Sequence, residues 1–230
     1  MRISTTDLDL QTRRHTAIFD HILSLGIPLD TPILDVGCGQ GLLARRLLDR
    51  GFSNIAACDR VTQQLMPPDS FKMLSKTTYM PLDLDVEGLA IYPDQFFNLV
   101  ICSDVLEHLE NPTHILRGIG RILSPQGIAL ITIPNAFNIF ERVRILRTGN
   151  SRRYKAEDPT LQRGHISMFS SQVLGSLFAR AGLEIVSALP GTCYWRGRVW
   201  FPGRRWNRLF SYDAYFVLRR KYGYSTESVP

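Results

Sequence analysis

The chain has 230 residues, of which 44% are hydrophobic, and a formal net charge of +6. A chain of this length and composition can bury one large core, so we expect a single domain over residues 1–230. No apolar run is long enough to span a bilayer, and the first residues, MRISTTDLDLQTRR, lack the apolar core of a secretory signal. These features favour a cytoplasmic protein over a membrane-spanning or secreted one.

The four cysteines are scattered and have no zinc-binding spacing. Three of them, Cys38, Cys58 and Cys102, lie in or beside predicted buried strands. We therefore expect reduced thiols that act as small apolar residues, as is usual in the cytoplasm.

The first predicted element is an amphipathic helix over Leu10–Leu25, and the most informative stretch, ILDVGCGQG, follows at residues 33–41. Residues 33–36 have the apolar character of a strand buried on both faces, and residues 42–48 are apolar and cationic at helical spacing. The glycines between them lie at a strand-to-helix turn, where the absence of a Cβ lets a ligand touch the main chain. Their spacing, GxGxG, differs from the GxGxxG of dinucleotide sites and disfavours a nicotinamide enzyme.

Two more strands with acids at their ends follow this loop. The segment NIAACD ends in Asp59, and TYMPLDL, over Thr78–Leu84, contains Asp83. Asp59 lies 24 residues after Asp35, close to the roughly 20 at which a carboxylate accepts ribose hydroxyls. Either aspartate alone could be a strand-end cap. Together with the glycine loop they favour a nucleoside cofactor, because several levels of the pattern agree.

The segment DVGCGQG, with Asp35 two positions before the first glycine, resembles the first motif of class I S-adenosylmethionine-dependent methyltransferases, and the resemblance continues along most of the chain. It implies that Asp59 binds the ribose hydroxyls and that Asp83 receives the adenine amino group, with the Leu84 main chain beside it. It also implies an α/β, Rossmann-like fold with a seven-stranded, mostly parallel sheet and helices on both faces. The cofactor-binding residues that we predict are Asp35, Gly37, Cys38, Gly39, Gly41, Asp59, Arg60, Asp83, Leu84, Ser103 and Asp104.

The later elements alternate between strand and helix as a parallel sheet requires. We predict strands at Phe96–Ser103, Gly127–Pro134, Leu183–Leu189 and Tyr212–Arg220, and helices at Pro112–Leu123 and Ser170–Gly182. An insertion over the active site follows the fifth strand at residues 135–169, and residues 222–230 are predicted to be a loose tail.

The net charge conceals a division of the chain. Residues 1–140 hold 11 Lys and Arg against 15 Asp and Glu, whereas residues 141–221 hold 16 against 5. The excess lies in the insertion, Asn135–Phe169, and in Cys193–Phe210, which also holds Trp195, Trp200 and Trp206. Such connections emerge near the ligand crevice of an open α/β sheet, so we expect a basic rim around the acceptor entrance. Mixed basic and aromatic residues suit an anionic membrane surface or RNA, and equally suit packing over the sheet edge.

The residues SDVLEH after the predicted fourth strand suggest the chemistry. Asp104, Glu107 and His108 would share one face if the segment were helical, and His165, in RGHISMFS, is a fourth candidate. The pattern resembles the acid-x-x-Glu-His element of ubiquinone-pathway O-methyltransferases and small-RNA 2′-O-methyltransferases, in which a divalent ion is implied. Such an ion stays an alternative, and we assign no metal site. We predict His165, His108 and Glu107 as catalytic, with His165 as a base that takes a hydroxyl proton.

The sequence lacks the Asn/Asp-Pro-Pro-aromatic element that is typical of enzymes that methylate exocyclic nitrogen. We therefore expect O-methylation of a small, lipid-linked or saccharide-linked acceptor of negative charge, by a cytoplasmic protein that contacts the inner membrane surface peripherally. The alternatives are an RNA 2′-O-methyltransferase and a non-catalytic, S-adenosylmethionine-binding regulatory protein. The sequence indicates neither the acceptor's identity nor the oligomeric state.

Overall fold

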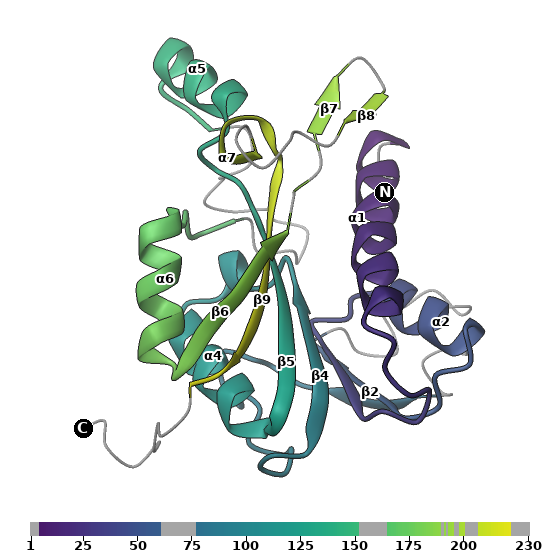
Figure 1. Ribbon diagram of the computed structural model, residues 1–230. Coiled ribbons are helices and arrows are strands. Elements are labelled where there is room, and N and C mark those ends of the chain that lie inside the picture. The colour runs from purple at the N-terminus through teal and green to yellow at the C-terminus, as the bar shows by residue number, and fades with distance from the viewer. Residues whose placement is uncertain are drawn as a thin grey trace. The chain divides into compact units, whose positions relative to one another are not determined.

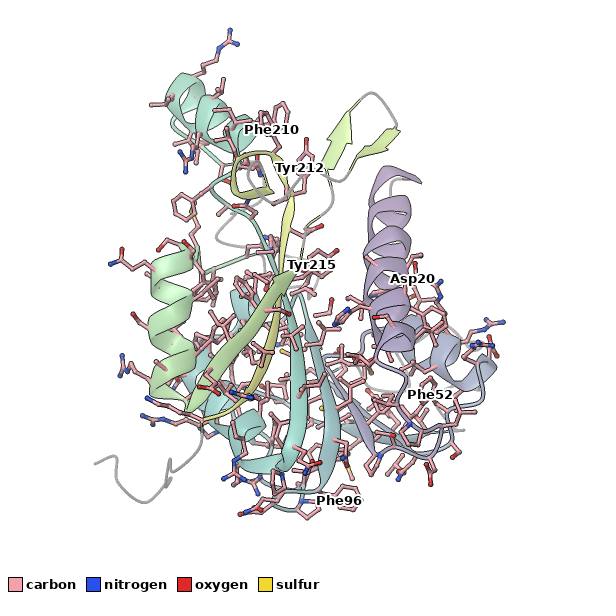
Figure 2. All side chains as sticks on the ribbon, in the orientation of Figure 1. Asp20, Phe52, Phe96, Phe210, Tyr212 and Tyr215 are labelled. Atoms are coloured by element: carbon pink, nitrogen blue, oxygen red, sulfur yellow. The ribbon has the colours of Figure 1, made fainter. Side chains whose placement is uncertain are left out.

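The structure is a computed structural model that describes residues 5–60, 77–151, 165–189, 191, 193–195, 198–200 and 207–221 (Figure 1). Side chains are described at residues 15–60, 77–151, 165–188, 191 and 209–221 (Figure 2). The chain forms two compact units, Met1–Leu82 and Asp83–Pro230, which we describe in turn. A single domain over the whole chain stays a prediction.

The first unit contains α1 (Thr5–Ser24), β1 (Ile33–Val36), α2 (Leu42–Asp49), β2 (Ile55–Asp59) and β3 (Thr78–Pro81). β2 pairs in parallel with both β1 and β3, and all four residues of β1 are buried, as the apolar run predicts. The first two predicted strands are confirmed. The third strand starts at Thr78 and ends at Pro81, so Asp83 follows the strand, as predicted.

Helix α1 begins five residues earlier than the predicted Leu10 and packs through Ile18 and Ile22, which are fully buried. It is fastened to α2 by Arg46, whose Nη1 donates a hydrogen bond of 2.8 Å to Thr16 Oγ1. The same guanidinium lies 4.6 Å from the centre of the Phe19 ring, a favourable cation–π contact. The first unit therefore holds its N-terminal helix by a polar clamp as well as by apolar packing.

The second unit provides the rest of the sheet. Its elements are β4 (Phe97–Ser103), the 3₁₀ helix η2 (Leu106–His108), α4 (Pro112–Ile122), β5 (Leu123–Pro134), α5 (Ile139–Thr148), α6 (Ser171–Arg180), β6 (Leu183–Leu189), β7 (Cys193–Trp195), β8 (Arg198–Trp200), α7 (Asn207–Phe210) and β9 (Asp213–Arg220). β4 and β5 are parallel, and β9 runs antiparallel between β5 and β6. The seven-stranded sheet has the order β3-β2-β1-β4-β5-β9-β6, which confirms the predicted fold class.

The two basic segments hold more regular structure than the sequence predicted. The insertion contains α5. The Asn138 side chain caps its start by accepting a hydrogen bond of 3.0 Å from the Glu141 amide, and Gly149, with φ +67°, caps its end. Strands β7 and β8 form a separate antiparallel pair. Parts of the predicted basic rim lie outside the described side chains: the three tryptophans and the insertion's cationic residues Arg152, Arg153, Lys155 and Arg163. The tail at 222–230 also lies outside the described residues.

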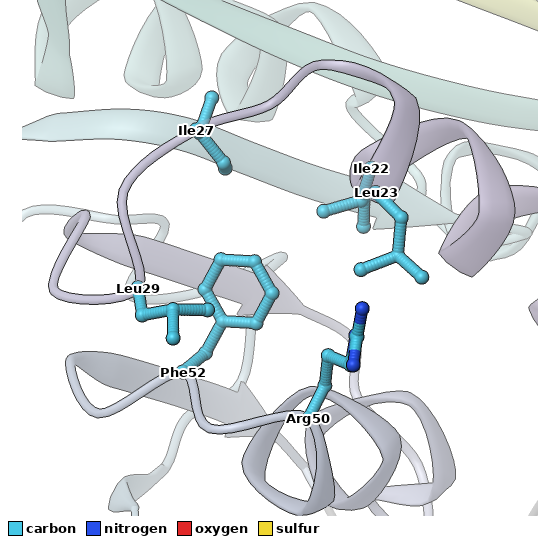
Figure 3. Close-up of a pocket in the computed structure, with 6 residues that line it drawn as sticks. All are labelled: Ile22, Leu23, Ile27, Leu29, Arg50 and Phe52. Atoms are coloured by element: carbon cyan, nitrogen blue, oxygen red, sulfur yellow. The ribbon is translucent and has the colours of Figure 1, made fainter.

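A surface hollow of about 290 Å³ lies in the first unit (Figure 3). Its lining residues are Ile22, Leu23, Ile27, Leu29, Arg50 and Phe52. None of the predicted site residues lines it, so we do not assign the cofactor to this hollow. Within the described residues, no helix has both the length and the apolar character needed to cross a membrane.

Candidate active site

The glycine loop presents its main chain, as the sequence predicts. Gly37, Gly39 and Gly41 have φ of 70°, 53° and 72°, a left-handed conformation that side chains rarely tolerate. The loop is fixed to β2 because the amides of Gly37 and Cys38 donate to the Cys58 carbonyl at 2.8 and 3.1 Å. A Cβ added at Gly39 would meet no described residue within 4 Å. Among the described residues, the loop therefore leaves room for a ligand.

Asp59 lies at the end of β2 and contacts this loop. Its Oδ2 accepts a hydrogen bond of 2.8 Å from the Gly39 amide, and its main-chain oxygen accepts one of 2.9 Å from the Leu82 amide. The next residue, Arg60, is exposed. The structure thus brings the predicted ribose-binding carboxylate to the glycine loop, 20 residues away in the sequence.

Asp35 is a buried carboxyl group in the same unit, 3% exposed. Its Oδ2 has no hydrogen-bond partner among the described residues. Burial, with a smaller contribution from the negative charge of Asp59, raises the pKa of Asp35 from 3.8 to about 7. Buried polar atoms are normally hydrogen-bonded, so this oxygen fits a ligand that brings a donor or a positive charge.

Cys38 is also buried, and its burial raises the pKa of the thiol far above its usual range. The thiol therefore stays protonated and acts as a small apolar group beside the loop. The expectation of buried free thiols is confirmed at Cys38, Cys58 and Cys102.

Asp83 and Leu84 belong to a tight turn at the start of the second unit. Asp83 Oδ1 accepts from the Asp85 amide at 3.0 Å, and the Asp83 amide donates to Glu87 Oε1 at 3.0 Å. Leu84 is buried. The predicted adenine-binding carboxylate thus has one oxygen committed to its own turn, which fixes its position.

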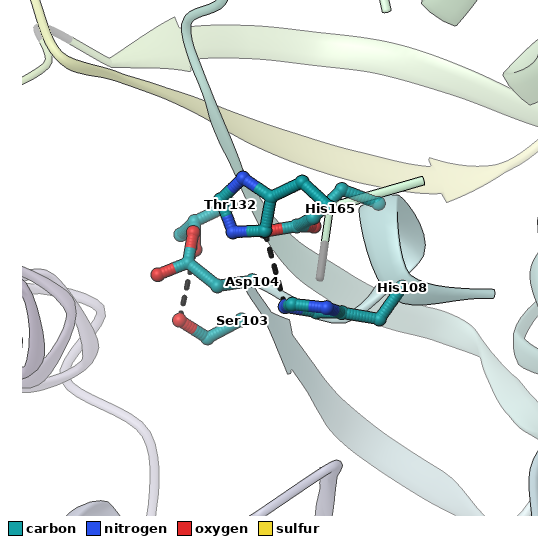
Figure 4. Close-up of polar contacts among 6 residues, drawn as sticks. Ser103, Asp104, His108, Thr132 and His165 are labelled. Atoms are coloured by element: carbon teal, nitrogen blue, oxygen red, sulfur yellow. Dashed lines mark hydrogen bonds and ion pairs between the residues drawn. The ribbon is translucent and has the colours of Figure 1, made fainter. Parts of the chain in front are cut away.

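The end of β4 carries a group of polar side chains, of which the sequence predicted Ser103 and Asp104. Ser103 Oγ lies 2.8 Å from Thr132 Oγ1 on the neighbouring strand β5, and Thr132 Oγ1 donates to Asp104 Oδ1 at 3.4 Å (Figure 4). The Asp104 amide donates to the Thr132 carbonyl at 3.0 Å. Thr132 was not predicted as a site residue, although a hydroxyl residue in the otherwise apolar run GIALITIP was a signal for it.

The expectation of a helical face shared by Asp104, Glu107 and His108 needs correction. The helix is one 3₁₀ turn, Leu106–His108, and Asp104 precedes it with φ +53°. A left-handed residue breaks the helical spacing, so Asp104 shares no helical face with the other two.

The three predicted catalytic residues do converge. Glu107 is fully buried, and its Oε1 lies 4.0 Å from His108 Nε2 and 3.9 Å from His165 Nε2. The two imidazole centres are 4.8 Å apart (Figure 4). The main chain explains the approach, because the Glu107 carbonyl accepts hydrogen bonds from the amides of Ile166 and Ser167. The end of the insertion is thereby tied to η2.

This cluster can serve two kinds of chemistry. A buried carboxylate favours the protonated form of a neighbouring imidazole, so His165 can accept a proton from a substrate. One ligand atom from each of the three side chains also lies within 4.8 Å of the others, and this donor set of two imidazoles and a carboxylate fits a divalent transition ion. The geometry alone is compatible with both.

Solved structures with the same fold are all distant in sequence. A putative methyltransferase in complex with the Trm112 activator of Haloferax volcanii has a TM-score of 0.65 and 17% identity, covering 95% of each chain. Magnesium protoporphyrin IX methyltransferase from Synechocystis, with bound S-adenosylhomocysteine, has a TM-score of 0.62 and 15% identity, covering 96% of this chain and 89% of that one. These likenesses define the fold as that of S-adenosylmethionine-dependent methyltransferases.

A family model described as a methyltransferase domain matches residues 10–188, and the chain belongs to this methyltransferase family. The family is one of methyltransferases, and two solved structures of similar fold hold S-adenosylhomocysteine, the product of the cofactor S-adenosylmethionine. The open glycine loop and the buried Asp35 oxygen fit this cofactor, which has N–H donors and a sulfonium charge.

The curated relatives share only part of their length with this chain. The ubiquinone biosynthesis O-methyltransferase of Rickettsia typhi is 33% identical over 103 residues, 45% of this chain and 41% of that protein. The enzyme of the same name from Rickettsia akari is 29% identical over 134 residues, 58% of this chain and 50% of that protein. The chain thus spans half or less of the length of these two relatives.

Proposed function

We propose that this methyltransferase acts on an oxygen of a small, lipid-linked or saccharide-linked acceptor, with His165 as the proton acceptor. The observation that carries the proposal is the buried Glu107 beside two imidazoles. Oxygen nucleophiles need a base more than amines do, because a hydroxyl keeps its proton at neutral pH. The names of the curated relatives, ubiquinone biosynthesis O-methyltransferases, agree with an oxygen target.

In this proposal the cofactor-binding residues follow the family resemblance. Asp59 accepts the ribose hydroxyls, Asp83 receives the adenine amino group with the Leu84 main chain beside it, and the glycine loop lies against the methionine end. Ser103 and Asp104 complete the set of polar groups, with Cys38 and Arg60 flanking the loop and the ribose carboxylate. The cofactor, when bound, supplies a methyl group on a sulfonium that is already activated for displacement.

The protein's own work is alignment and proton transfer. His165 Nε2 takes the acceptor's hydroxyl proton as the methyl group moves to oxygen, and Glu107 stabilises the imidazolium that forms. His108, whose Nε2 lies 4.0 Å from the same Glu107 oxygen, helps to fix the carboxylate. The His165 side chain is 22% exposed whereas Glu107 is completely buried, so the base is accessible and its partner is shielded.

A divalent ion held by Glu107, His108 and His165 is the alternative for the same cluster. It would polarise the acceptor oxygen instead of leaving the proton to His165. A chelator distinguishes the two: we expect unchanged turnover after exhaustive dialysis against it. Loss of turnover that is restored by a divalent ion would replace the base with a metal site.

The proposed acceptor is anionic and linked to a membrane, and α5 supports this. Val143 and Leu146 are 45% and 86% exposed, and Arg142, Arg144 and Arg147 on the same helix are exposed as well. Its one acid, Glu141, is buried and accepts a hydrogen bond from Ser151. A helix with exposed apolar side chains, whose exposed charged side chains are all cationic, suits the surface of an anionic bilayer.

The experiment follows a labelled methyl group. The full chain is incubated with carbon-13 methyl-labelled S-adenosylmethionine and with organic-soluble, aqueous and RNA fractions of a cell extract. We expect label in the organic-soluble or glycan-containing fraction, with the carbon-13 chemical shift of a methyl on oxygen. A methyl on nitrogen would contradict the proposed base, and label in RNA would favour the 2′-O-methyltransferase instead.

A further inference from the structure

Asp104 has an unusual backbone conformation that needs a physical cause. Among the described residues only Asp104 and Gln95 have a positive φ without being glycine. The conformation is unfavourable for a residue with a side chain and persists where surrounding contacts impose it. Thr132 provides two such contacts: its carbonyl accepts from the Asp104 amide, and its hydroxyl donates to Asp104 Oδ1.

Thr132 is itself held firmly. It is fully buried in β5, where it lies opposite Ser103 of β4 and opposite Tyr215 of β9. Neighbours in the same strand, Ile131 and Ile133, are apolar and buried. The Thr132 hydroxyl therefore has a fixed place between Ser103 and Asp104 (Figure 4).

The direction of the hydrogen bonds follows from the chemistry of the three groups. A carboxylate only accepts, so the single Thr132 hydroxyl proton goes to Asp104. The 2.8 Å contact between the two hydroxyls must then run from Ser103 to Thr132. The Ser103 hydroxyl donates its only proton in this contact, so toward a ligand it can act only as a hydrogen-bond acceptor.

An edge made of an acceptor-only hydroxyl and a carboxylate selects for a donor, above all for a cation. The cofactor has three kinds of donor: the ribose hydroxyls, the adenine amino group and the amino group of its methionine part. The first two belong to Asp59 and Asp83 in the proposed function. The methionine amino group is positively charged and has three N–H donors, so one acceptor such as the Asp35 oxygen does not exhaust it, and the end of β4 can accept from it as well.

We propose that Thr132 is a positioning residue that makes the Ser103 hydroxyl an acceptor for the methionine amino group of the cofactor. It acts through Ser103 and Asp104 without touching the cofactor. This inference rests on the proposed placement of those two residues in the cofactor site.

The test compares two ligands that differ in the amino-acid part. S-adenosylhomocysteine carries the amino group, and 5′-methylthioadenosine keeps the adenine and ribose but lacks it. Calorimetry on the full chain should show Thr132→Val binding S-adenosylhomocysteine about tenfold more weakly, the effect of one hydrogen bond to a charged group. The same variant should bind 5′-methylthioadenosine within about twofold of wild type. Thr132→Ser keeps the hydroxyl and should bind both ligands as the parent does.

Other outcomes would overturn the proposal. Equal losses for the two ligands, unchanged binding of S-adenosylhomocysteine, or a Thr132→Ser variant that matches Thr132→Val would each assign Thr132 to packing alone. Ser103→Ala gives an independent check if the valine variant does not fold, because it should also weaken S-adenosylhomocysteine selectively. In the double variant the two losses should not add, since both act on the same interaction. Failure of the wild-type chain to bind either ligand would instead contradict the cofactor site itself.

Discussion

At the scale of single residues, the two units each bury a carboxyl group for a different purpose. Asp35 has an oxygen without a hydrogen-bond partner among the described residues, beside the glycine loop, and its pKa is raised to about 7. Glu107 Oε1 lies 4.0 Å from His108 Nε2 and 3.9 Å from His165 Nε2. The first arrangement costs folding energy that a ligand can recover, and the second serves proton transfer in the proposed function.

The raised pKa of Asp35 predicts a pH dependence of stability. The folded-state pKa, about 7, exceeds the reference value of 3.8, so the carboxyl group favours folding when protonated. Stability from this group is complete below the unfolded-state pKa and is lost as the pH rises through about 7. Asp35→Asn, which cannot ionise, should raise the unfolding midpoint of the ligand-free chain by a few degrees near pH 8 and by much less near pH 4. A constant difference across this range would contradict the assignment.

The carboxylate of Asp59 should matter to cofactor affinity. Asp59→Ala removes both the hydrogen bond to the Gly39 amide and the proposed acceptor for the ribose. We expect S-adenosylhomocysteine binding to weaken by about 1–3 kcal/mol in calorimetry, the cost of an unsatisfied buried polar group. Asp49→Ala is the matched control, because Asp49 is exposed on α2, where its carboxylate pairs with Arg45. Equal affinity in the Asp59 variant and the control would remove Asp59 from the site.

His165 should control turnover and not cofactor affinity. His165→Ala should lower the rate of methyl transfer by about 10²- to 10⁴-fold, the usual contribution of a general base, while S-adenosylhomocysteine binds nearly as tightly. His114, an exposed histidine at the start of α4 in the same unit, gives the control: His114→Ala should transfer methyl groups at the parental rate. A His165 variant with parental turnover would exclude it as the base.

At the scale of elements, the sequence predicted most strands because their signals are local. The apolar runs of β1, β2, β4 and β6 fall at or within a residue of the predicted bounds. Helix α5 was missed, although Asn138 at its start and Gly149 at its end are ordinary capping signals. The many arginines drew attention to its charge, and the apolar residues Ile139, Val143 and Leu146, which are at helical spacing, were overlooked.

The site residues that belong to a sequence motif could be predicted, whereas those whose positions depend on backbone geometry could not. Glu107, His108 and His165 were chosen from residue type, and they meet in the structure. The left-handed turn at Asp104 and its dependence on Thr132 arise from pairing between β4 and β5. No spacing along one segment could reveal a contact between residues that are 28 positions apart.

Helix α5 carries the membrane prediction. Leu146→Glu replaces the most exposed apolar side chain of the helix with an acid, which should sharply reduce sedimentation with vesicles that contain anionic phospholipid. Val86→Glu is the control, because Val86 is 80% exposed but lies outside the basic segments. If the control loses sedimentation equally, or if neither chain binds vesicles at physiological salt, α5 is not a membrane contact. RNA binding that is abolished by Leu146→Glu would assign the helix to a nucleic-acid surface.

At the scale of the whole molecule, charge is unevenly distributed along the chain. The glycine loop lies in the acidic first part, residues 1–140, whereas residues 141–221 carry 16 Lys and Arg against 5 Asp and Glu. Segments of one sign around an entrance concentrate ligands of the opposite sign, and salt weakens the effect. The chain spans half or less of the length of the two ubiquinone-pathway relatives described above, so its acceptor need not be theirs.

The central claim is that this chain catalyses methyl transfer and does more than bind its cofactor. The most direct measurement incubates the chain, in excess over labelled S-adenosylmethionine, with fractions of a cell extract, and quantifies S-adenosylhomocysteine and methylated product together. We predict that the two appear in equal amounts with one fraction, and that the His165→Ala variant slows both to the same extent. S-adenosylmethionine that binds tightly and is recovered unchanged with every fraction would show a binding protein and contradict the account.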